Sequence, residues 1–232
     1  DTPGFSGAQL ENVINEAAII AARDSMSVIN STAVDAALDR VTLGLPRSSM
    51  ISMKQKQLVA YHEAGHAIVG SFIEDYDRVD RISILPRSNG AGGFTRFMPS
   101  EDISGSLYTK QYLKDKITVL LGGRIAEEII YGPNHTTTGA SSDLQSVRSL
   151  ARNMVTLYGF GGVPVAWDTE FERTASAETE TNIDKWIAYI VQECRERARE
   201  ILSTNVDLLH ALADELVMKE TLYKKDIDEL LV

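Results

Sequence analysis

The chain has 232 residues, of which 44% are hydrophobic, so it is long enough for one large domain or two small ones with a substantial core. Its formal net charge of -10 and its pI near 4.9 argue against a nucleic-acid partner, because phosphate binding requires clustered Lys and Arg. The single cysteine, Cys194, excludes an internal disulfide and a cysteine-rich metal cluster.

The sequence has neither a run of about 18 apolar residues nor a secretory signal. It opens on DTPGFSGAQL, without an initiator Met and in what reads as the middle of an element. We therefore expect a fragment of a longer protein, for which the lack of a membrane span or targeting peptide in these residues says nothing about the full-length chain.

Two helices are predicted near the N-terminus. Gly4 to Gly7 reads as a turn, with Ser6 as the N-cap of a helix from Ala8 to about Asp24. A second helix, from about Thr32 to Val41, has apolar residues at helical spacing and follows another Ser/Thr cap. Together they indicate a small helical piece.

A linker is predicted after these helices, because Leu43 to Ser52 is rich in Gly, Pro and Ser. We place a boundary there. The chain is thus divided into a helical segment, residues 1–46, and a larger domain, residues 47–232.

The larger domain begins with an apolar run, Val59 to Gly70, in which His62, Glu63 and His66 form the pattern HExxH. Histidines four apart lie on one helix face with Cβ atoms roughly 5–6 Å apart, so both imidazoles can reach one ion. Catalytic zinc takes three protein ligands and a water, from which the glutamate can accept a proton. The alternative is a pair of hydrogen-bonded core histidines. The apolar flanks favour zinc, because ionisable groups on a buried helix are costly unless they are paired or ligated.

Two short strands are predicted next. Arg78 to Pro86 alternates apolar and polar residues, and Phe94 to Met98 follows a Gly-rich turn. The glycines Gly90, Gly92 and Gly93 do not match GxGxxG, so a hairpin turn is favoured over a phosphate-binding loop. We expect a mainly α fold with a small β-hairpin or sheet beside the HExxH helix.

The second strand is a candidate for substrate binding, because many zinc peptidases hold substrate as an added strand on a sheet edge. The alternative is an ordinary paired strand. The residues of this candidate substrate strand are Gly93, Phe94, Thr95, Arg96, Phe97 and Met98.

A long helix is predicted from about Thr109 to Ile130. Its adjacent interior glycines, Gly122 and Gly123, cost about 1–2 kcal/mol relative to alanines, which indicates close approach of another helix. Glu127 and Glu128 are either a solvated pair or include one carboxylate that faces the zinc or a ligating histidine.

The polar loop after this helix contains two candidates for a third zinc ligand. Asp143 precedes a helix predicted from about Leu144 to Tyr158, where it is either a first-turn acid or the third ligand. His135 is a rival, since imidazole binds zinc equally well.

The last third of the domain reads as helices at Thr181 to Leu202 and Val206 to Lys219. Trp186 is expected in the core or at an interface, and His210 is expected to be solvated or capping. The charged residues between Arg195 and Glu200 are expected to form a mixed solvated face.

Several motifs together resemble the FtsH family of membrane-bound AAA proteases, and most closely its cyanobacterial and chloroplast members. In order, they are GFSGAQLENVINEAA, YHEAGH, ISILPRSNGAGGFTRF, LLGGRIAEEIIYG and TTGASSDLQ. The resemblance covers nearly the whole chain. It implies a helical zinc-peptidase domain, residues 47–232, preceded by a helical fragment of an AAA lid, residues 1–46.

The resemblance also implies roles for site residues. His62, His66 and Asp143 are implied as ligands of one Zn²⁺ per chain, Glu63 as the general base, and Glu127 as a residue beside the site that does not bind the ion. Gln9 and Ser142 are departures, because many members have Asp and Asn at these positions.

The implied function is ATP-dependent proteolysis of unfolded polypeptides or membrane proteins by a homo- or hetero-hexamer, with no nucleic-acid partner. The P-loop that binds ATP and the membrane anchor are expected in segments absent from these residues. The peptidase domain is expected on the stromal, matrix or cytoplasmic side of a membrane, with the thylakoid or bacterial inner membrane favoured over the mitochondrial inner membrane. Two alternatives are a catalytically silent assembly subunit, which the intact HExxH disfavours, and a helical interaction module, which leaves the strand pair unexplained.

Overall fold

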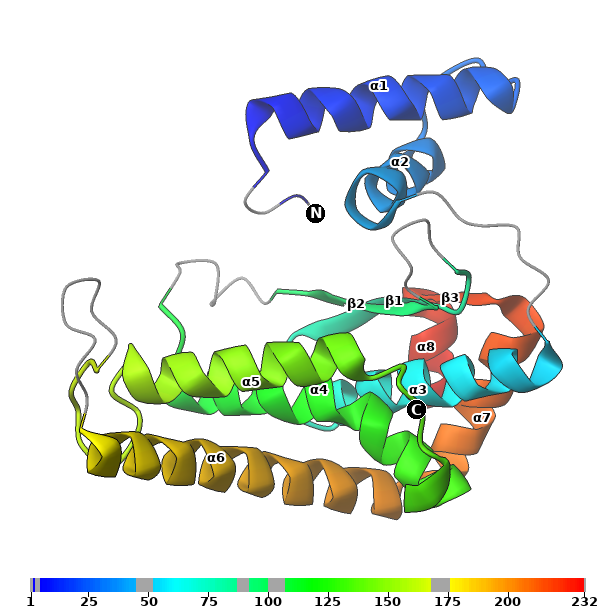
Figure 1. The fold of residues 1–232 in the computed structure, drawn as a ribbon. Helices are drawn as coiled ribbons and strands as arrows, with labels where there is room; N and C mark the ends of the chain where they lie inside the picture. The colour runs from blue at the N-terminus through cyan, green and yellow to red at the C-terminus, as the bar shows by residue number, and fades with distance from the viewer. Residues whose placement is uncertain are drawn as a thin grey trace. The chain divides into compact units, whose positions relative to one another are not determined.

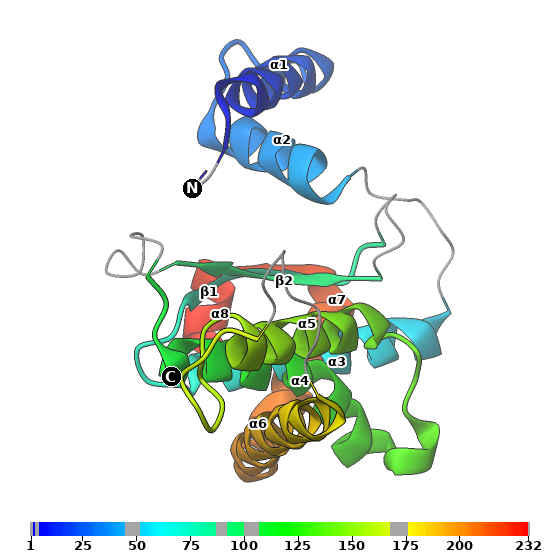
Figure 2. The ribbon, with the colours of Figure 1, turned by 60° about the vertical axis from the view of Figure 1, so that its left-hand side comes forward.

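The structure is a computed structural model that describes residue 2 and residues 5–44, 52–86, 92–99, 107–167 and 176–231. The described part is mainly helical with a small antiparallel sheet, as predicted (Figures 1 and 2). It divides into a first unit, Asp1–Ile51 with Leu85–Gly93, and a second unit, Ser52–Ile84 with Phe94–Val232. The predicted boundary between residues 46 and 47 lies outside the described residues and stays a prediction.

Helix α1 (Gly7–Arg23) of the first unit begins after the predicted N-cap, Ser6. The Ser6 hydroxyl accepts a hydrogen bond from the Gln9 N–H at 3.3 Å, and the Gln9 side chain accepts one from the Ser6 N–H at 2.8 Å. This capping box gives Gln9 a local structural role. Gly4, in the predicted turn, lies outside the described residues.

Helix α2 (Ser31–Leu43) is capped by Asn30, whose side chain accepts from the Ala33 N–H at 2.9 Å. The predicted Ser/Thr cap was therefore wrong, because the helix starts one residue before Thr32 and the asparagine already satisfies a free N–H group of the first turn. The two helices share a small apolar core formed by Val13, Ala17, Ile20, Ala21, Ala33, Ala37 and Leu38.

The second unit is built around α3 (Met53–Ser71), which starts with a capping box between Ser52 and Gln55. Every residue from His62 to Gly70 is buried. Strand β1 (Arg78–Ser83) packs against α3, as do the helices α4 (Lys110–Tyr131) and α7 (Val206–Lys219). The apolar flanks of the HExxH pattern thus have partners on several sides, as the composition of this helix predicts.

The sheet has the order β2-β1-β3 within the described residues. Strands β1 (Arg78–Ser83) and β2 (Phe94–Met98) pair antiparallel, as predicted, whereas β3 (Thr221–Tyr223) was not predicted. A register irregularity between Val79 and Arg81 breaks the expected alternation of β1, so that Arg81 is also buried. Its guanidinium lies 4.8 Å from the centre of the Tyr223 ring, so an aromatic face covers this buried charge.

The other helices of this unit have different partners: α5 packs on α4 and α6, whereas α8 packs on α7 and on strands β1 and β3. Helix α6 packs against α4 and α5, opposite the sheet. Their bounds are Pro133–His135 for the short 3-10 helix η2, Ser141–Thr156 for α5, Ala177–Thr204 for α6 and Lys224–Leu231 for α8.

The charged stretch on α6 is partly solvated, as predicted: Glu196 and Glu200 are exposed, and the side chains of its three arginines are 40–42% exposed. Arg195 and Arg199 also bind the partly buried Glu128 carboxylate of α4, and Arg197 binds Asp115 of the same helix. The prediction missed these ion pairs, because only the folded chain brings α4 alongside α6. Trp186, nearer the N-terminus of α6, is 40% exposed and packs against Gly161 and Gly162.

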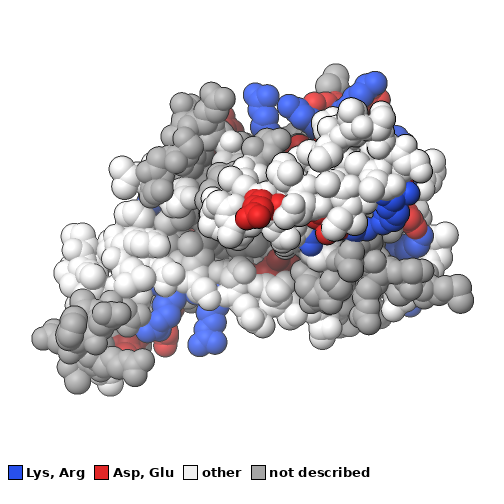
Figure 3. All heavy atoms as spheres, turned by 90° about the horizontal axis from the view of Figure 1, so that it is seen from above, with Lys and Arg blue, Asp and Glu red and all other residues white. Residues whose placement is uncertain are grey.

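Charged side chains of both signs are interspersed on the face shown in Figure 3. Among the described helices, none combines the length and the apolar composition needed to span a membrane.

Candidate metal centre

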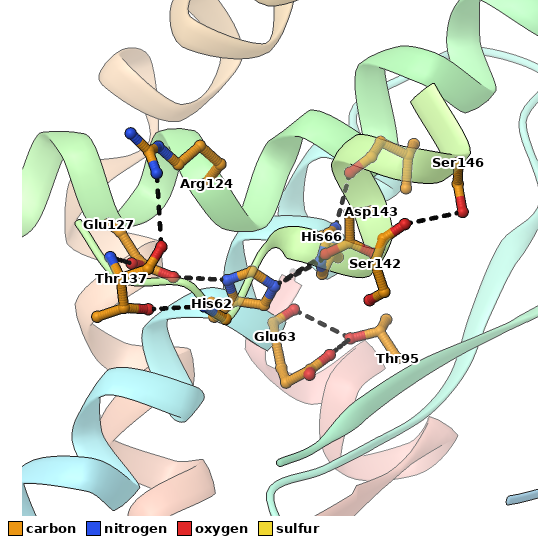
Figure 4. A network of polar contacts seen from close by, with 12 residues as sticks. His62, Glu63, His66, Thr95, Arg124, Glu127, Thr137, Ser142, Asp143 and Ser146 are labelled. Carbon is orange, nitrogen blue, oxygen red and sulfur yellow. Dashed lines mark hydrogen bonds and ion pairs between the residues drawn. The ribbon is translucent and has the colours of Figure 1, made fainter. Parts of the chain in front are cut away.

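Two histidines of α3 form the first half of the site (Figure 4). His62 and His66 lie one turn apart, and their Nε2 atoms are 3.1 Å from each other. Both residues are buried, with 9% and 8% of their surface exposed. Two imidazole nitrogens therefore point at one small volume inside the domain.

The other ring nitrogen of each histidine is held by a partner on α4. His66 Nδ1 lies 2.8 Å from the carbonyl oxygen of Val119, and His62 Nδ1 lies 2.8 Å from Glu127 Oε1. A carbonyl can only accept, so His66 Nδ1 must carry a hydrogen, and Nε2 of the neutral ring is left with a free lone pair. The carboxylate of Glu127 favours the same tautomer for His62.

Close packing of α3 on α4 brings these partners within reach. A Cβ atom at Gly65 would lie 2.5 Å from the Gly122 carbonyl oxygen, and one at Gly123 would lie 2.6 Å from the His62 ring. The predicted close approach of another helix at Gly122 and Gly123 is confirmed, and that helix is α3. The absence of side chains at these positions allows the two backbones to touch beside the histidines.

Asp143 supplies the second half of the site from the start of α5. Its Oδ2 atom lies 3.2 Å from His62 Nε2 and 3.5 Å from His66 Nε2, and the side chain is 21% exposed. Helix α5 begins at Ser141 and not at Leu144 as predicted. Asp143 is therefore both an acid in the first turn and a neighbour of the histidines.

The remaining histidines lie elsewhere. His135 is exposed at the end of η2, and His210 is exposed on α7, where Nδ1 lies 2.8 Å from the Tyr61 hydroxyl. Within the described part of the chain, His62, His66 and Asp143 are the set of three His, Cys, Asp or Glu side chains whose donor atoms converge, all within 4.8 Å.

The spacing of these donors fits a zinc ion. Zinc–ligand bonds of 2.0–2.1 Å in a tetrahedron place neighbouring donors about 3.3–3.4 Å apart. The three distances observed here are 3.1, 3.2 and 3.5 Å. Two imidazoles and one carboxylate also make a donor set that leaves the fourth position for a water or substrate oxygen.

Glu127 connects the two halves of the site. Its Oε1 faces His62, and its Oε2 accepts a hydrogen bond of 2.7 Å from the Thr137 N–H, in the loop that leads to Asp143. Burial raises the pKa of this carboxyl, but the hydrogen bonds from His62 and Thr137 outweigh it and leave the pKa below its usual range. Of the two adjacent glutamates, Glu127 thus faces the histidine and Glu128 binds arginines.

The same contacts shift the pKa values of His62 and Asp143. Burial lowers the pKa of His62, but hydrogen bonds to Asp143 and Glu127 raise it to about 10. Burial raises the pKa of Asp143, but its hydrogen bonds with His62 and His66 hold it well below the usual range. Zinc needs the deprotonated imidazole nitrogen, so zinc binding at His62 competes with protonation.

Glu63 is buried beside the histidines, with 6% of its surface exposed. Burial raises its pKa, which suits a carboxylate that has to accept a proton near neutral pH. Its Oε2 accepts a hydrogen bond of 2.8 Å from the hydroxyl of Thr95 on β2. Sequence reasoning placed Thr95 only in the candidate substrate strand, because no local pattern indicates a contact between residues 32 positions apart.

A buried HExxH helix that meets a carboxylate from a second helix, inside a mainly helical domain, defines a metal-dependent peptidase. The model for peptidase family M41 matches residues 49–230, and the model for the AAA+ lid domain matches residues 1–36. The chain belongs to peptidase family M41, and the predicted resemblance to FtsH proteases is confirmed.

Three curated relatives illustrate the similarity. The chain is 46% identical over 245 residues to "ATP-dependent zinc metalloprotease FtsH 3" of Synechocystis, covering 99% of this chain and 40% of the relative. It is 41% identical to the chloroplastic FTSH 5 of Arabidopsis thaliana, covering 100% of this chain and 35% of that protein. It is also 41% identical to FtsH of Buchnera aphidicola, covering 99% and 40%. The chain thus spans well under half the length of these relatives.

Proposed function

We propose that this chain is the peptidase part of an ATP-dependent zinc endopeptidase, which degrades unfolded or membrane proteins delivered by an attached AAA ATPase. The observation that carries the proposal is the convergence of His62, His66 and Asp143 at tetrahedral spacing, with Glu63 buried beside them. The names of the relatives support zinc and ATP dependence, and the lid match supports an attached ATPase.

The chemistry assigned to this site is peptide hydrolysis. When bound to His62, His66 and Asp143, zinc polarises the scissile carbonyl and lowers the pKa of a water molecule towards about 7. The Glu63 carboxylate takes a proton from the attacking water and then gives it to the nitrogen of the leaving amine. Glu127 and the Val119 carbonyl keep the imidazoles in the tautomer that offers Nε2 to the ion.

Strand β2 is the proposed binding edge for substrate. It stands at one end of the β2-β1-β3 order, and Thr95, its second residue, contacts Glu63. A substrate strand paired to residues 93–98 would place its backbone near the histidines, whatever its side chains. This edge suits a peptidase that acts on many sequences.

Assembly and location follow from the relatives and belong to the same proposal. A hexamer, homomeric or heteromeric, would join six such sites to the ATPase ring, whose P-loop lies outside these residues. The cyanobacterial and chloroplastic relatives favour anchorage in a thylakoid or bacterial inner membrane, with the peptidase on the stromal or cytoplasmic side. A mitochondrial inner membrane, with the peptidase in the matrix, is the less favoured location.

The proposal is tested by comparing the parent chain with the Glu63→Gln variant. The zinc content of each is measured, together with the chelator-sensitive hydrolysis of an unfolded protein and of a short peptide. We expect about one zinc per chain in both, and cleavage in the parent only, because the amide keeps the shape of the carboxylate but cannot accept the proton. Cleavage by the variant at the parental rate would contradict the role of Glu63. A parent that binds zinc but cleaves neither substrate would favour the silent assembly subunit.

A further inference from the structure

We propose that Thr95 is a positioning residue that fixes the orientation of the Glu63 carboxylate, so that strand β2 aligns both the substrate and the general base. The inference rests on the proposed function, because it takes Glu63 as the base. It assigns to a side chain of β2 a role beyond backbone pairing.

The contact between the two residues is direct. Thr95 Oγ1 lies 2.8 Å from Glu63 Oε2 and 3.1 Å from the backbone oxygen of the same glutamate (Figure 4). A hydroxyl has one hydrogen to donate, and an ionised carboxylate is the stronger acceptor. Thr95 therefore donates to Oε2 when Glu63 is ionised.

Burial alone does not fix a carboxylate plane, because the terminal torsion of Glu is broad and roughly twofold. A charge-assisted hydrogen bond to one oxygen removes this freedom. The other oxygen is then presented in one direction, as proton transfer from a water requires. The Thr95 hydroxyl can thus orient the Glu63 carboxylate, which contacts with apolar side chains alone cannot do.

Strand β2 holds Thr95 firmly in place. Thr95 pairs with Ile82 of β1, Arg96 binds Asp80, and the Phe97 ring lies so close to α3 that a Cβ atom at Gly70 would be 2.3 Å from it. Glu63 and Gly70 are seven residues apart, about two turns, so Thr95 and Phe97 contact the same face of α3. The strand is therefore attached to this helix at two points, one of which is the general base.

Successive side chains of β2 point to opposite faces of the sheet, as in any β-strand. Thr95 and Phe97 point to α3, whereas the Arg96 side chain between them binds Asp80. Only the positions that face the helix can act on the site. Among these two, Thr95 carries the hydrogen-bonding group.

The experiment compares Thr95→Val, which removes the hydroxyl at nearly constant shape, with Thr95→Ser, which keeps it. A control of the same kind is Thr156→Val on α5, where a more deeply buried threonine hydroxyl donates to the Arg152 carbonyl and not to Glu63. Each whole chain is loaded with zinc, its crystal structure is determined, and kcat and KM are measured with a short peptide that needs no unfolding.

For Thr95→Val we expect unchanged zinc content, KM within about twofold, and kcat lower by about tenfold or more, the effect of losing one hydrogen bond to a charged group. The Glu63 carboxylate should occupy more than one orientation in this variant. Thr95→Ser should keep the parental orientation and most of kcat, and Thr156→Val should leave both unchanged.

Two results would overturn the proposal. One is a Thr95→Val chain with the parental kcat and a single parental orientation of Glu63. The other is a Thr95→Ser chain as impaired as Thr95→Val, which would assign the effect to strand packing. If the zinc-loaded parent cleaves no peptide, the proposed function fails, but the orientation of Glu63 in the two variants still decides the role of Thr95.

Discussion

The two halves of the metal centre are held in different ways. His62 and His66 stand on a buried helix whose backbone touches α4 at Gly65 and Gly122, and each ring has a second partner on α4. Asp143 stands at the start of α5, is partly exposed, and follows a loop that is attached to the site through Thr137 and Glu127.

This difference indicates that helix packing positions the two proposed histidine ligands, whereas the position of the proposed third ligand, Asp143, depends on a tethered loop. Rigid, close-packed helices set the distance between the histidines. The position of Asp143 depends on a few hydrogen bonds across the loop. The substitutions below perturb each half and then the link between them, in order of decreasing effect.

The largest effect is expected for Asp143→Ala, which removes the tethered donor and leaves the histidine pair intact. Zinc affinity should fall by more than about 100-fold, because even residues that only support a ligand contribute 10–100-fold. Titration of the metal-free chain with zinc against a competing chelator measures it. His135→Ala is the control and should bind zinc like the parent. The opposite result, with zinc lost only in His135→Ala, would make His135 the third ligand.

A smaller effect, and one of a different kind, is expected for Gly65→Ala in the rigid half. The new Cβ would lie 2.5 Å from the Gly122 oxygen and 2.7 Å from the Ala126 Cβ, so α3 and α4 must separate. Overpacking of about 1–3 kcal/mol or more should exceed the gain of about 1 kcal/mol in helix propensity. The free energy of unfolding should therefore decrease.

Denaturant unfolding followed by tryptophan fluorescence tests this prediction. The two tryptophans, Trp167 and Trp186, both lie in the second unit and report on it. An unchanged midpoint in Gly65→Ala would show that the two helices can move apart freely.

The smallest effect is expected for Glu127→Gln, which alters the link between the halves. The amide oxygen can still accept one hydrogen bond, but the charge that strengthens the basicity of His62 is lost, so zinc affinity should fall by about tenfold. The neighbouring Glu128→Gln is the matched control. It should lower stability, since Arg195 and Arg199 lose the negative charge of their partner, and leave zinc affinity unchanged. Equal zinc affinities in both variants would remove Glu127 from the metal centre.

The features that were predicted most accurately are those that local sequence patterns determine. Helix α7 has the predicted bounds, α1 and α4 agree within a residue or so, and the HExxH spacing placed both histidines on one helix face. The adjacent glycines of α4 predicted a close contact with another helix, because glycine destabilises the interior of a helix and such a contact can offset this cost. These features depend on residues within a few turns of each other.

The features that were missed depend on distant partners. Strand β3 is three residues long and exists because it pairs with β1. The ion pairs between the arginines of α6 and the carboxylates of α4 could not be predicted, because the two helices are distant in the sequence. The start of α5 was predicted too late, because Ala140 provides no side-chain cap. For the third ligand, residue patterns alone could not choose between Asp143 and His135. That choice came from the family resemblance, and the structure brings Asp143 to the histidines.

The pairing of β1 with β3 also sets an order of events during synthesis. Ser83 and Thr221, whose side chains are hydrogen-bonded, are 138 residues apart, and α7, which packs on α3, is also made late. At about 5–20 residues per second, roughly 7–28 s separate the emergence of these partners from the ribosome. The HExxH helix is therefore made well before α7, one of the elements that bury it. A nascent chain carries the histidines without the completed core, so the fold around the proposed zinc site can be completed only when translation of this domain is nearly finished.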